Sequence, residues 1–510
     1  MSRPDDPRRR HFVLGAAAGA AAAALPALRG LSLPAEDETE LTAVEAVARM
    51  SRGELSCERY AAALLERCRA AHALNAFITL EPDRVLESAR ERDRERKSGQ
   101  TPGPLFGLPI PVKDSVNTRD YTTTGGTPAL RHFRPKEDAP LVASLRAAGA
   151  LVLGKTNLHE LSYGWTSNNL AFGAVHNPYD PSRIPGGSSG GTAAAIAARL
   201  APLGIAEDTE GSIRVPAAFC GIVGFRPTTG RYSTRACVPI SSLFDQAGPH
   251  ARSMADIRLF DSVLVPDGRP VEVRPLRGVR LGIVRDYWYA GLDPAVERIT
   301  DAALARLTQA GAVLVETPLV GLERLVGLTT DQVQNHDVRL ALARYLEEYG
   351  AGVTLDELVA QASPDIRAIF KSDVMPGGAN VVSEPAYAAA RDRYLPELRQ
   401  LYRTYFEKTG VAALVFPATR VAAPRIGEET TLDIGGRPVP FEQAVARNIA
   451  PGSTAGIPGL VLPAGLTAAG LPVALEFDGP AHSDRTLIEL GASLERALGS
   501  IPPPHRGEAV

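Results

Sequence analysis

The sequence predicts an α/β fold in which helices flank a central mixed β-sheet on both faces. Short apolar runs alternate with helical patterns along most of the 510 residues, and apolar residues make up 45% of the chain. Strands that alternate with helices favour a mixed or parallel sheet covered on both faces. No internal repeat interrupts this alternation. The length fits one large α/β domain or two or three ordinary ones, and one contiguous domain is the simplest division.

The first 35 residues are predicted to be a twin-arginine export signal followed by a linker. Residues 8–14 read Arg-Arg-Arg-His-Phe-Val-Leu, and a hydrophobic stretch extends from there to about residue 28. This stretch is mostly alanine, which makes it a poor membrane anchor. The alternative is a disordered basic tail before an alanine-rich helix. We expect an exported protein, periplasmic or secreted, whose single domain spans residues 36–505.

The first half of that domain begins with helices and continues with strands. Thr42 and Ser56 are suited to cap two helices within residues 41–70, because serine and threonine are favoured at N-caps. A charged, solvent-facing helix is expected over residues 84–97. The remaining predicted elements of this half are strands at residues 108–112, 149–153 and 202–206 and helices at residues 139–148 and 192–199.

The second half continues the same alternation. Asp293 can cap a helix that has Pro294 at its first position and Gly311 just past its end. Residues 317–400 are expected to be largely helical. The other predicted elements are strands at residues 279–284, 312–315, 412–416, 460–462 and 473–477 and a closing helix at residues 484–498.

Composition narrows the classes of function. A net charge of −3 gives no reason to expect a nucleic acid or an anionic membrane surface as partner. The four cysteines and nine histidines show no zinc spacing, and no His-Glu-x-x-His is present, so we expect no metal and no organic cofactor. An exported protein can form disulfides, whereas the thiols of a protein that folds before export can stay free.

Lys113 is the first candidate catalytic residue. Only six of the 55 basic residues are lysines, and this one directly follows the apolar run Leu-Pro-Ile-Pro-Val at residues 108–112. Burial disfavours the charged form of lysine, so its pKa falls and the neutral amine can act as a base. The alternative is an end-of-strand lysine paired with Asp114, because structural ion pairs also perturb lysines.

Two serines, Ser188 and Ser212, lie 24 residues apart in glycine-rich segments. Ser188 lies in Gly-Gly-Ser-Ser-Gly-Gly, which allows close backbone approach but is also typical of flexible linkers. The helix expected next favours an ordered loop-to-helix junction. Ser212 comes soon after a predicted strand, where a nucleophile can be exposed beside N–H groups that stabilise an oxyanion. The alternative for Ser212 is a helix cap.

Taken together, these segments resemble the amidase signature family over about residues 42–500, and most strongly over residues 104–260. The resemblance implies the amidase signature fold and hydrolysis of carboxamide C–N bonds through an acyl-enzyme. It implies that Lys113 is the base and that Ser212 is the nucleophile. Ser188, which would follow a cis peptide bond from Gly187, would pass protons between the two. By the same resemblance, the backbone N–H groups of Thr209, Glu210, Gly211 and Ser212 would form the oxyanion hole, with Ser189, Asp208 and Arg214 in support.

One position departs from the family's pattern, and this departure concerns specificity. The family commonly has glycine where this chain has Glu210, which can still supply a backbone N–H if its φ stays negative. Residues 122–130, 155–161, 167–173 and 225–231 resemble the mandelamide and indoleacetamide hydrolases of the family.

That narrower resemblance implies small aryl or arylacetamide-type amides as substrates, cleaved to a carboxylate and ammonia or an amine. Tyr163 and Trp165 are candidate pocket walls, although buried aromatics more often serve packing. His159 is interpreted as structural. Esters, anilides or carbamates are alternative substrates. A homodimer is expected only by analogy with the family, and no stable membrane insertion is expected.

Rival interpretations leave residues unexplained. Gly-Gly-Ser-Ser-Gly at residues 186–190 fits the Gly-x-Ser-x-Gly of an α/β-hydrolase, with His336, His482 and Asp478 available as partners. The upstream His-Gly-Gly-Gly type of motif is absent, and Lys113 would have no role. No lysine has a serine three residues before it, which excludes a β-lactamase-like Ser-x-x-Lys motif. A subunit of a tRNA-dependent amidotransferase would act in the cytoplasm, which the predicted export signal opposes. A protein that only binds its ligand would not need Lys113, Ser188 and Ser212 together.

Overall fold

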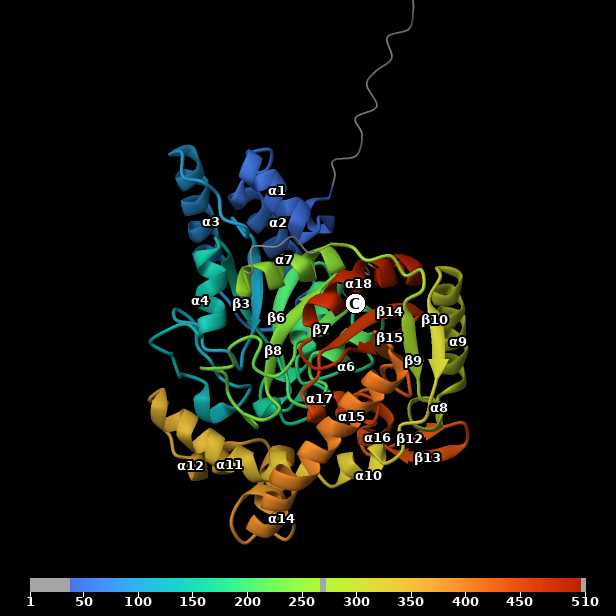
Figure 1. Cartoon of the computed structure of the whole chain (residues 1–510). Helices are drawn as coiled ribbons and strands as arrows, with labels where there is room; N and C mark the ends of the chain where they lie inside the picture. Colours follow the sequence, from blue (N-terminus) through green and yellow to red (C-terminus); the bar gives the residue numbers. More distant parts are fainter. Residues whose placement is uncertain (1–36, 267–271, 506–510) are drawn as a thin grey trace, which may run out of the picture. The chain divides into compact units, whose positions relative to one another are not determined.

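A mixed β-sheet of eleven strands forms the centre of the computed structural model, which describes residues 37–266 and 272–505 (Figure 1). The predicted fold class is therefore confirmed. Two small hairpins stand outside this sheet. The strands are β1 (Phe77–Leu80), β2 (Pro109–Lys113), β3 (Leu151–Thr156), β4 (Asn168–Asn169), β5 (Gly173–Ala174), β6 (Leu203–Asp208), β7 (Val223–Arg226), β8 (Gln246–Ala251), β9 (Arg280–Ile283), β10 (Val313–Glu316), β11 (Ala413–Pro417), β12 (Thr431–Ile434), β13 (Arg437–Pro440), β14 (Gly459–Leu466) and β15 (Pro472–Asp478).

The rest of the described chain consists of helices and the loops that connect them. Short 3₁₀ turns occur at Glu38–Glu40, His72–Leu74, Pro128–Leu130 and Glu160–Ser162, and π-helical turns η5 and η6 at Phe370–Val374 and Ala390–Tyr394. The α-helices are α1 (Ala43–Arg52), α2 (Cys57–Ala70), α3 (Pro82–Lys97), α4 (Pro140–Ala147), α5 (Gly190–Ala197), α6 (Arg214–Phe219), α7 (Met254–Leu264), α8 (Arg285–Trp288), α9 (Pro294–Gln309), α10 (Leu322–Gly327), α11 (Thr330–Glu348), α12 (Leu355–Gln361), α13 (Pro364–Ile369), α14 (Glu384–Ala389), α15 (Leu395–Thr409), α16 (Phe441–Val445), α17 (Ala450–Ala455) and α18 (Asp484–Leu498).

The strand order brings the two motif-bearing strands together. The sheet runs β1-β3-β2-β6-β8-β7-β14-β15-β11-β9-β10. Strand β2 is parallel to both β3 and β6, with Val112 opposite Ile205. Because the carboxyl ends of parallel strands meet at the same edge of a sheet, the residues that follow β2 and β6 share one edge. Antiparallel pairing takes over from β8 to β11.

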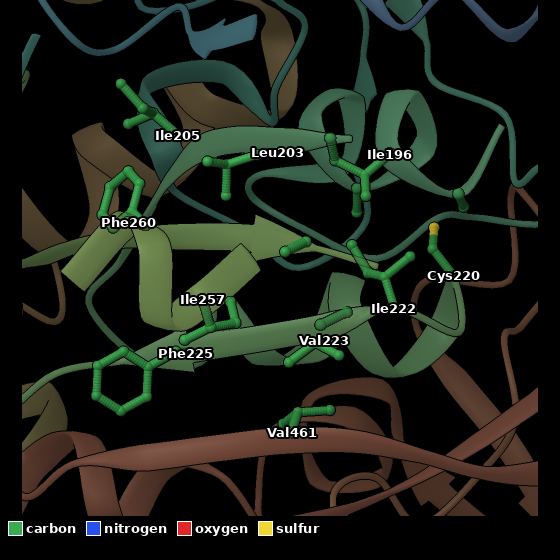
Figure 2. Packing of buried hydrophobic residues seen from close by; sticks show 14 of the residues in the cluster. Ile196, Leu203, Ile205, Cys220, Ile222, Val223, Phe225, Ile257, Phe260 and Val461 are labelled. Atoms are coloured by element: carbon green, nitrogen blue, oxygen red, sulfur yellow. The ribbon is translucent and has the colours of Figure 1, made fainter. Parts of the chain in front are cut away.

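Two groups of helices bury the sheet. Helices α5 and α6 contact each other and the central strands, whereas α18 contacts both α7 and α9 as well as the strands. Figure 2 shows how this core fills: Ile196 of α5, Leu203 and Ile205 of β6, Phe225 of β7 and Ile257 of α7 gather around the central strands, together with other apolar side chains. Each of these five side chains is at most 2% exposed. Burial of this kind supplies most of the stabilisation of a domain.

Local signals in the sequence correctly located several helix starts. Thr42 forms a capping box with Glu45, and the Ser56 hydroxyl accepts a hydrogen bond from the N–H of Arg59 at 3.1 Å. The Asp293 carboxylate accepts from the N–H of Ala295 at 2.8 Å, and Pro294 is the first residue of α9. The closing helix has the predicted limits.

Other elements were not predicted. Strands β1, β7 and β8 and the β12–β13 hairpin carry no expectation from the sequence, and the segment expected to be largely helical divides into several helices, α10 to α15, with two π-helical turns. From Glu38 onward the described chain forms one compact unit. The predicted export signal lies outside the described residues. No helix in the described ranges is long and apolar enough to cross a lipid bilayer.

Candidate active site

The three candidate catalytic residues come from three neighbouring structural elements. Lys113 is the last residue of β2, and Ser212 lies in the turn after β6, the strand parallel to β2. Ser188 lies just before α5. The shared sheet edge explains why positions 99 residues apart, Lys113 and Ser212, belong to one site.

Lys113 and Ser188 are in direct contact. Nζ of Lys113 donates a hydrogen bond to Oγ of Ser188 at 2.7 Å, and both side chains are completely buried. Burial lowers the pKa of the Lys113 ammonium from its usual value, while the neighbouring carboxylate of Glu207 opposes this shift. A buried lysine of lowered pKa beside a hydroxyl can remove a proton from that hydroxyl.

Glu207 also belongs to this site, although no role was predicted for it from the sequence. Its Oε2 lies 3.5 Å from Nζ of Lys113 and accepts hydrogen bonds from the hydroxyls of Ser115 at 2.7 Å and Ser162 at 3.3 Å. The carboxylate is 2% exposed. The Glu207 carboxylate therefore forms an ion pair with the Lys113 ammonium and places a negative charge next to it.

The backbone fixes Ser188 from several directions. The Gly187–Ser188 peptide bond is cis, as the resemblance implied. The carbonyl of Ser188 accepts hydrogen bonds from the N–H of His159 at 3.0 Å and the hydroxyl of Ser167 at 3.1 Å. A Cβ at Gly187 would lie 2.7 Å from the backbone nitrogen of Thr166, so only glycine fits there.

Ser189 and His159 support this loop. The Ser189 hydroxyl donates to the carbonyl of Glu207 at 3.0 Å, and the Ser189 N–H donates to the carbonyl of Ser212 at 3.3 Å. These bonds tie the loop before α5 to the turn after β6. The buried ring of His159 pairs with the hydroxyl of Thr166 at 3.1 Å, and burial lowers the pKa of its imidazole to about 4. Its position fits a structural role.

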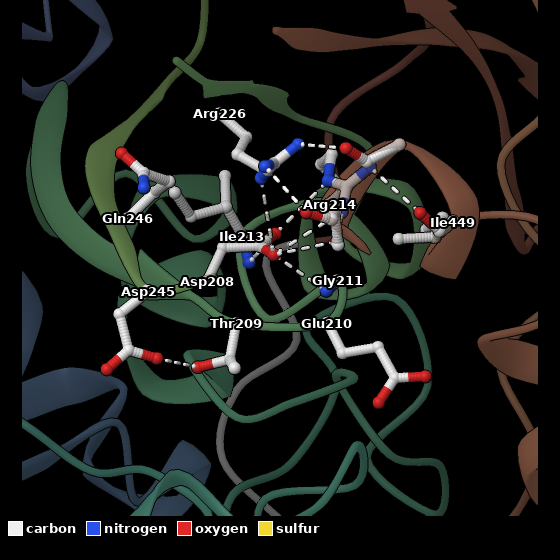
Figure 3. Close-up of polar contacts among 12 residues, drawn as sticks. Asp208, Thr209, Glu210, Gly211, Ile213, Arg214, Arg226, Asp245, Gln246 and Ile449 are labelled. Carbon is white, nitrogen blue, oxygen red and sulfur yellow. Dashed lines mark hydrogen bonds and ion pairs between the residues drawn. The ribbon is translucent and has the colours of Figure 1, made fainter. Parts of the chain in front are cut away.

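The turn that carries Ser212 is built around the carboxylate of Asp208. This carboxylate accepts hydrogen bonds from the N–H groups of Gly211 at 2.7 Å and Ile213 at 2.9 Å and from Nε of Arg214 at 3.1 Å (Figure 3). Gly211 has a φ of +105°, a conformation that favours glycine. The Gly211 N–H, which the resemblance places in the oxyanion hole, thus donates to Asp208 in this structure.

Arg214 anchors the same turn to strand β15, which is separated from β6 in the sheet by β8, β7 and β14. Its guanidinium hydrogen bonds with Asp208, with Glu476 of β15 and with the hydroxyl of Ser453, and all four side chains are fully buried. Although burial acts in the opposite direction, the charges of Arg214 and Arg226 lower the pKa of Asp208 to about 2. Asp208 is therefore a permanent anion that organises the turn.

Three of the four expected oxyanion donors remain available. The N–H groups of Thr209, Glu210 and Ser212 have no acceptor among the residues that the structure describes. Glu210 keeps a negative φ, so its side chain does not prevent the backbone from serving as donor. The Ser212 side chain is 6% exposed, and its hydroxyl makes no hydrogen bond within the described ranges.

A cavity of about 340 Å³ opens directly on Ser212. Both candidate wall residues, Tyr163 and Trp165, line this cavity. Hydrogen bonds hold them in place: Nε1 of Trp165 donates to the carbonyl of Glu210 at 3.0 Å, and the hydroxyl of Tyr163 donates to the side chain of Asn335. The sequence did not predict the wall contributed by helices of the second half. The lining residues from there are Asp331, Gln334, Asn335, Ile369, Asp373 and Glu442.

The histidine and aspartate that an α/β-hydrolase mechanism would need as partners of Ser188 make other contacts. Within the described ranges, the hydroxyl of Ser188 has Lys113 as its hydrogen-bond partner. His336 instead pairs with Glu384 at 3.1 Å. Asp478 is buried on β15, where burial raises the pKa of its carboxyl although the charge of Arg214 opposes this shift. No group of three or more His, Cys, Asp or Glu side chains in the described part of the chain could hold a metal ion.

Comparisons with known proteins agree with this architecture. A family model described as Amidase matches residues 59–488. An indoleacetamide hydrolase of Agrobacterium vitis is 38% identical over 453 residues, which are 88% of this chain and 95% of that protein. A mandelamide hydrolase of Pseudomonas putida is 38% identical over 482 residues, 92% of this chain and 93% of that protein.

Solved structures give the same result. The native peptide amidase of Stenotrophomonas maltophilia superposes with a TM-score of 0.76 at 32% identity, covering 91% of this chain and 98% of that chain. A further crystal structure of an amidase gives a TM-score of 0.81 at 31% identity, covering 90% of this chain and all of that one. The chain therefore belongs to the amidase signature family and is a hydrolase of amide bonds.

Proposed function

We propose that Ser212, Ser188 and Lys113 carry out amide hydrolysis through an acyl-enzyme. The contact of 2.7 Å between Nζ of Lys113 and Oγ of Ser188, in a fully buried position, supports this most strongly. Oγ of Ser212 attacks the amide carbonyl carbon, its proton passes to Ser188, and the proton of Ser188 passes to Lys113. The tetrahedral oxyanion receives hydrogen bonds from the free N–H groups of Thr209, Glu210 and Ser212.

The same proton path then works in reverse. The C–N bond breaks, and the leaving nitrogen takes a proton that returns from Lys113 through Ser188. Water next attacks the ester carbonyl on Ser212 and gives up its proton along the same path. The C–O bond to Ser212 breaks, the serine regains its proton, and a carboxylic acid leaves and ionises. No step in this sequence uses a histidine.

The proposed substrates are small aryl or arylacetamide-type primary amides. A cavity of about 340 Å³ has room for one such acyl group, and Tyr163 and Trp165 supply aromatic walls. The relatives named indoleacetamide hydrolase and mandelamide hydrolase support this class. Esters and anilides of the same acyl groups form the alternative class and share the acyl-enzyme step.

A hydrolysis panel tests both parts of the proposal. Ammonia release from benzamide, phenylacetamide, mandelamide and indoleacetamide is compared with cleavage of an anilide and a p-nitrophenyl ester. We expect Ser212→Ala and Lys113→Ala each to lower kcat/KM for the amides by at least about 10³-fold, because the groups act as a unit. The exposed serine of α7 supplies the control Ser262→Ala, which should leave the rates unchanged.

Two results would contradict the assignment. Activity that survives Ser212→Ala but is lost in Ser188→Ala would make Ser188 the nucleophile. An ester rate that is fast where every amide is inert would favour the alternative substrates. A mass increase equal to the acyl group on a peptide containing Ser212, trapped with the p-nitrophenyl ester, whose good leaving group makes acylation fast, would support the acyl-enzyme independently of the rates.

We also propose that the protein is exported in its folded state by the twin-arginine route and acts in the periplasm or outside the cell. The run of three arginines at residues 8–10, followed by an alanine-rich hydrophobic stretch, supports this. All four cysteines are buried and form no disulfide, which agrees with folding before transport.

A further inference from the structure

The cavity in front of Ser212 is strongly acidic. Four carboxyl groups line it, and its lining contains no lysine, arginine or histidine. The four come from separate elements: the turn after β6, helix α11, the π-helical turn η5 and helix α16. They are Glu210, Asp331, Asp373 and Glu442. Carboxylates gathered in a concave site with no cation create a negative potential that attracts positive ligands and repels anions.

A second observation links these carboxyl groups to a ligand. The hydroxyl of Ser212, whose side chain is 94% buried (6% exposed), borders the same cavity and has no hydrogen-bond partner within the described ranges. Because Ser212 lines the acidic cavity, a molecule bound in this cavity can contact its hydroxyl. Glu210 lies two residues before Ser212, and Figure 3 shows its side chain turned away from the Asp208–Arg214 network.

Neighbouring polar and aromatic groups fit a cation as well. Oε2 of Glu210 accepts a hydrogen bond from Nε2 of Gln334 at 2.9 Å, which holds the carboxyl at the cavity wall. The indole of Trp165 is fixed by its bond to the Glu210 carbonyl and lines the same space. An aromatic face beside carboxylates attracts organic cations.

The arrangement favours an organic cation over a metal ion. Among the described residues, no group of three or more His, Cys, Asp or Glu side chains is close enough to hold a metal. Asp331 and Glu442 are exposed, whereas Glu210 and Asp373 are partly buried. Carboxyl groups distributed along a cavity suit an ammonium group carried on a larger molecule.

We propose that the preferred substrate is a small carboxamide whose acyl group carries an ammonium or similar organic cation, recognised by Glu210 and Asp331 with Trp165. This inference rests on the proposed amidase function and narrows its substrate class. Burial, followed by the charge of Asp331, raises the pKa of Glu210 to about 8, so this carboxyl is mostly protonated at pH 7 while the cavity is empty and ionises when a cation binds beside it. A bound cation would offset the repulsion between these carboxyl groups.

The test uses two ligands of nearly equal shape, 4-(aminomethyl)phenylacetamide and 4-ethylphenylacetamide, with 4-(carboxymethyl)phenylacetamide as the anionic probe. Binding to the Ser212→Ala variant is measured by calorimetry, and kcat/KM is measured on the enzyme with Ser212 intact. Both use low ionic strength, because salt screens exposed charges. We expect the ammonium compound to be preferred over the ethyl compound at least about 10-fold in both measurements, and the anion to be disfavoured.

Substitutions show which residues cause the preference for the ammonium compound. Glu210→Gln and Asp331→Asn should each lower the ratio of ammonium to ethyl compound by about threefold or more, in calorimetry as well as in kcat/KM. Asp301→Asn, which removes an exposed carboxyl on α9, should leave the ratio as it is.

The outcomes separate this inference from the proposed function. Equal binding and equal hydrolysis of the ammonium and ethyl compounds would overturn the inference and leave the amidase mechanism standing. Preferential binding of the ammonium compound without hydrolysis of any amide would support the inference and count against the mechanism. A preference that survives both Glu210→Gln and Asp331→Asn would overturn the assignment of these residues.

Discussion

Burial and the carboxylate of Glu207 act in opposite directions on the pKa of Lys113, so a substitution of Glu207 should change this pKa. Burial lowers the pKa of Lys113, and the carboxylate 3.5 Å away opposes that shift. Glu207→Gln removes the opposing charge, so the pKa of Lys113 should fall further. If neutral Lys113 is the base, kcat/KM rises as the pH passes its pKa. We therefore expect the rising limb of the pH profile to move to lower pH by roughly one unit.

The pH profile separates this role from a purely structural one. A structural defect would lower the rate at all pH values without moving the limb. Glu316→Gln, which alters an exposed carboxyl on β10, serves as the matched control and should keep the wild-type profile. A limb that stays in place or moves to higher pH in Glu207→Gln would contradict the proposed influence on Lys113.

The candidate catalytic residues could be predicted from the sequence, whereas the cavity could not. Lys113, Ser188 and Ser212 lie in segments whose composition and spacing are specific, so they could be singled out before the structure was known. Asp331 and Glu442 lie more than 100 residues beyond Ser212 on helices without a motif. A charged residue on an amphipathic helix normally faces solvent, and only the tertiary fold directs these two to the cavity.

A buried network of ion pairs connects the turn after β6 to the rest of the domain, so its loss should destabilise the protein. Arg214 joins Asp208 of this turn to Glu476 of β15, and all three side chains are fully buried. Arg214→Met should lower the free energy of unfolding by about 3–5 kcal/mol, since it leaves buried carboxylates without their partner. Urea unfolding followed by circular dichroism measures the loss.

An exposed arginine supplies the comparison. Arg285 pairs with Glu316 at 2.8 Å, and both side chains are at least half exposed. Arg285→Met should therefore change the free energy of unfolding by no more than about 1 kcal/mol. Similar losses in the two variants would show that the buried network does not hold the turn. If the turn positions Ser212, Arg214→Met should also reduce amide hydrolysis at temperatures where the variant remains folded.

The success of the element predictions depended on local chemistry. Helix starts were found where a serine, threonine or aspartate could cap the backbone, as at Ser56 and Asp293. Strand β8 was missed because its six residues, Gln-Ala-Gly-Pro-His-Ala, contain no β-branched or aromatic residue. It is nevertheless fully buried between β6 and β7, so pairing and burial determine its conformation. The β12–β13 hairpin turns at Gly435-Gly436, a signal that could have been recognised.

At the scale of the whole molecule, the fold does not depend on an oxidising compartment. All four cysteines are buried and free, and burial raises the pKa of the Cys68 thiol to about 12. A buried thiol of raised pKa carries little of the reactive thiolate. The domain can therefore complete its core in a reducing cytoplasm without disulfides. This is the condition that a protein must meet if it crosses a membrane already folded, as substrates of the twin-arginine route do.

The export proposal is compatible with that property and can be tested on the complete chain. In a host with a twin-arginine translocase, active enzyme should appear in the periplasmic fraction or the medium. The double substitution Arg9→Lys with Arg10→Lys should retain it in the cytoplasm, because that route requires the arginine pair. Arg3→Lys should not change the distribution. Retained enzyme should have the same specific activity as exported enzyme, because folding precedes transport. Equal export of the double variant, or retention of the wild-type chain, would contradict the assignment of residues 1–35 as a twin-arginine signal.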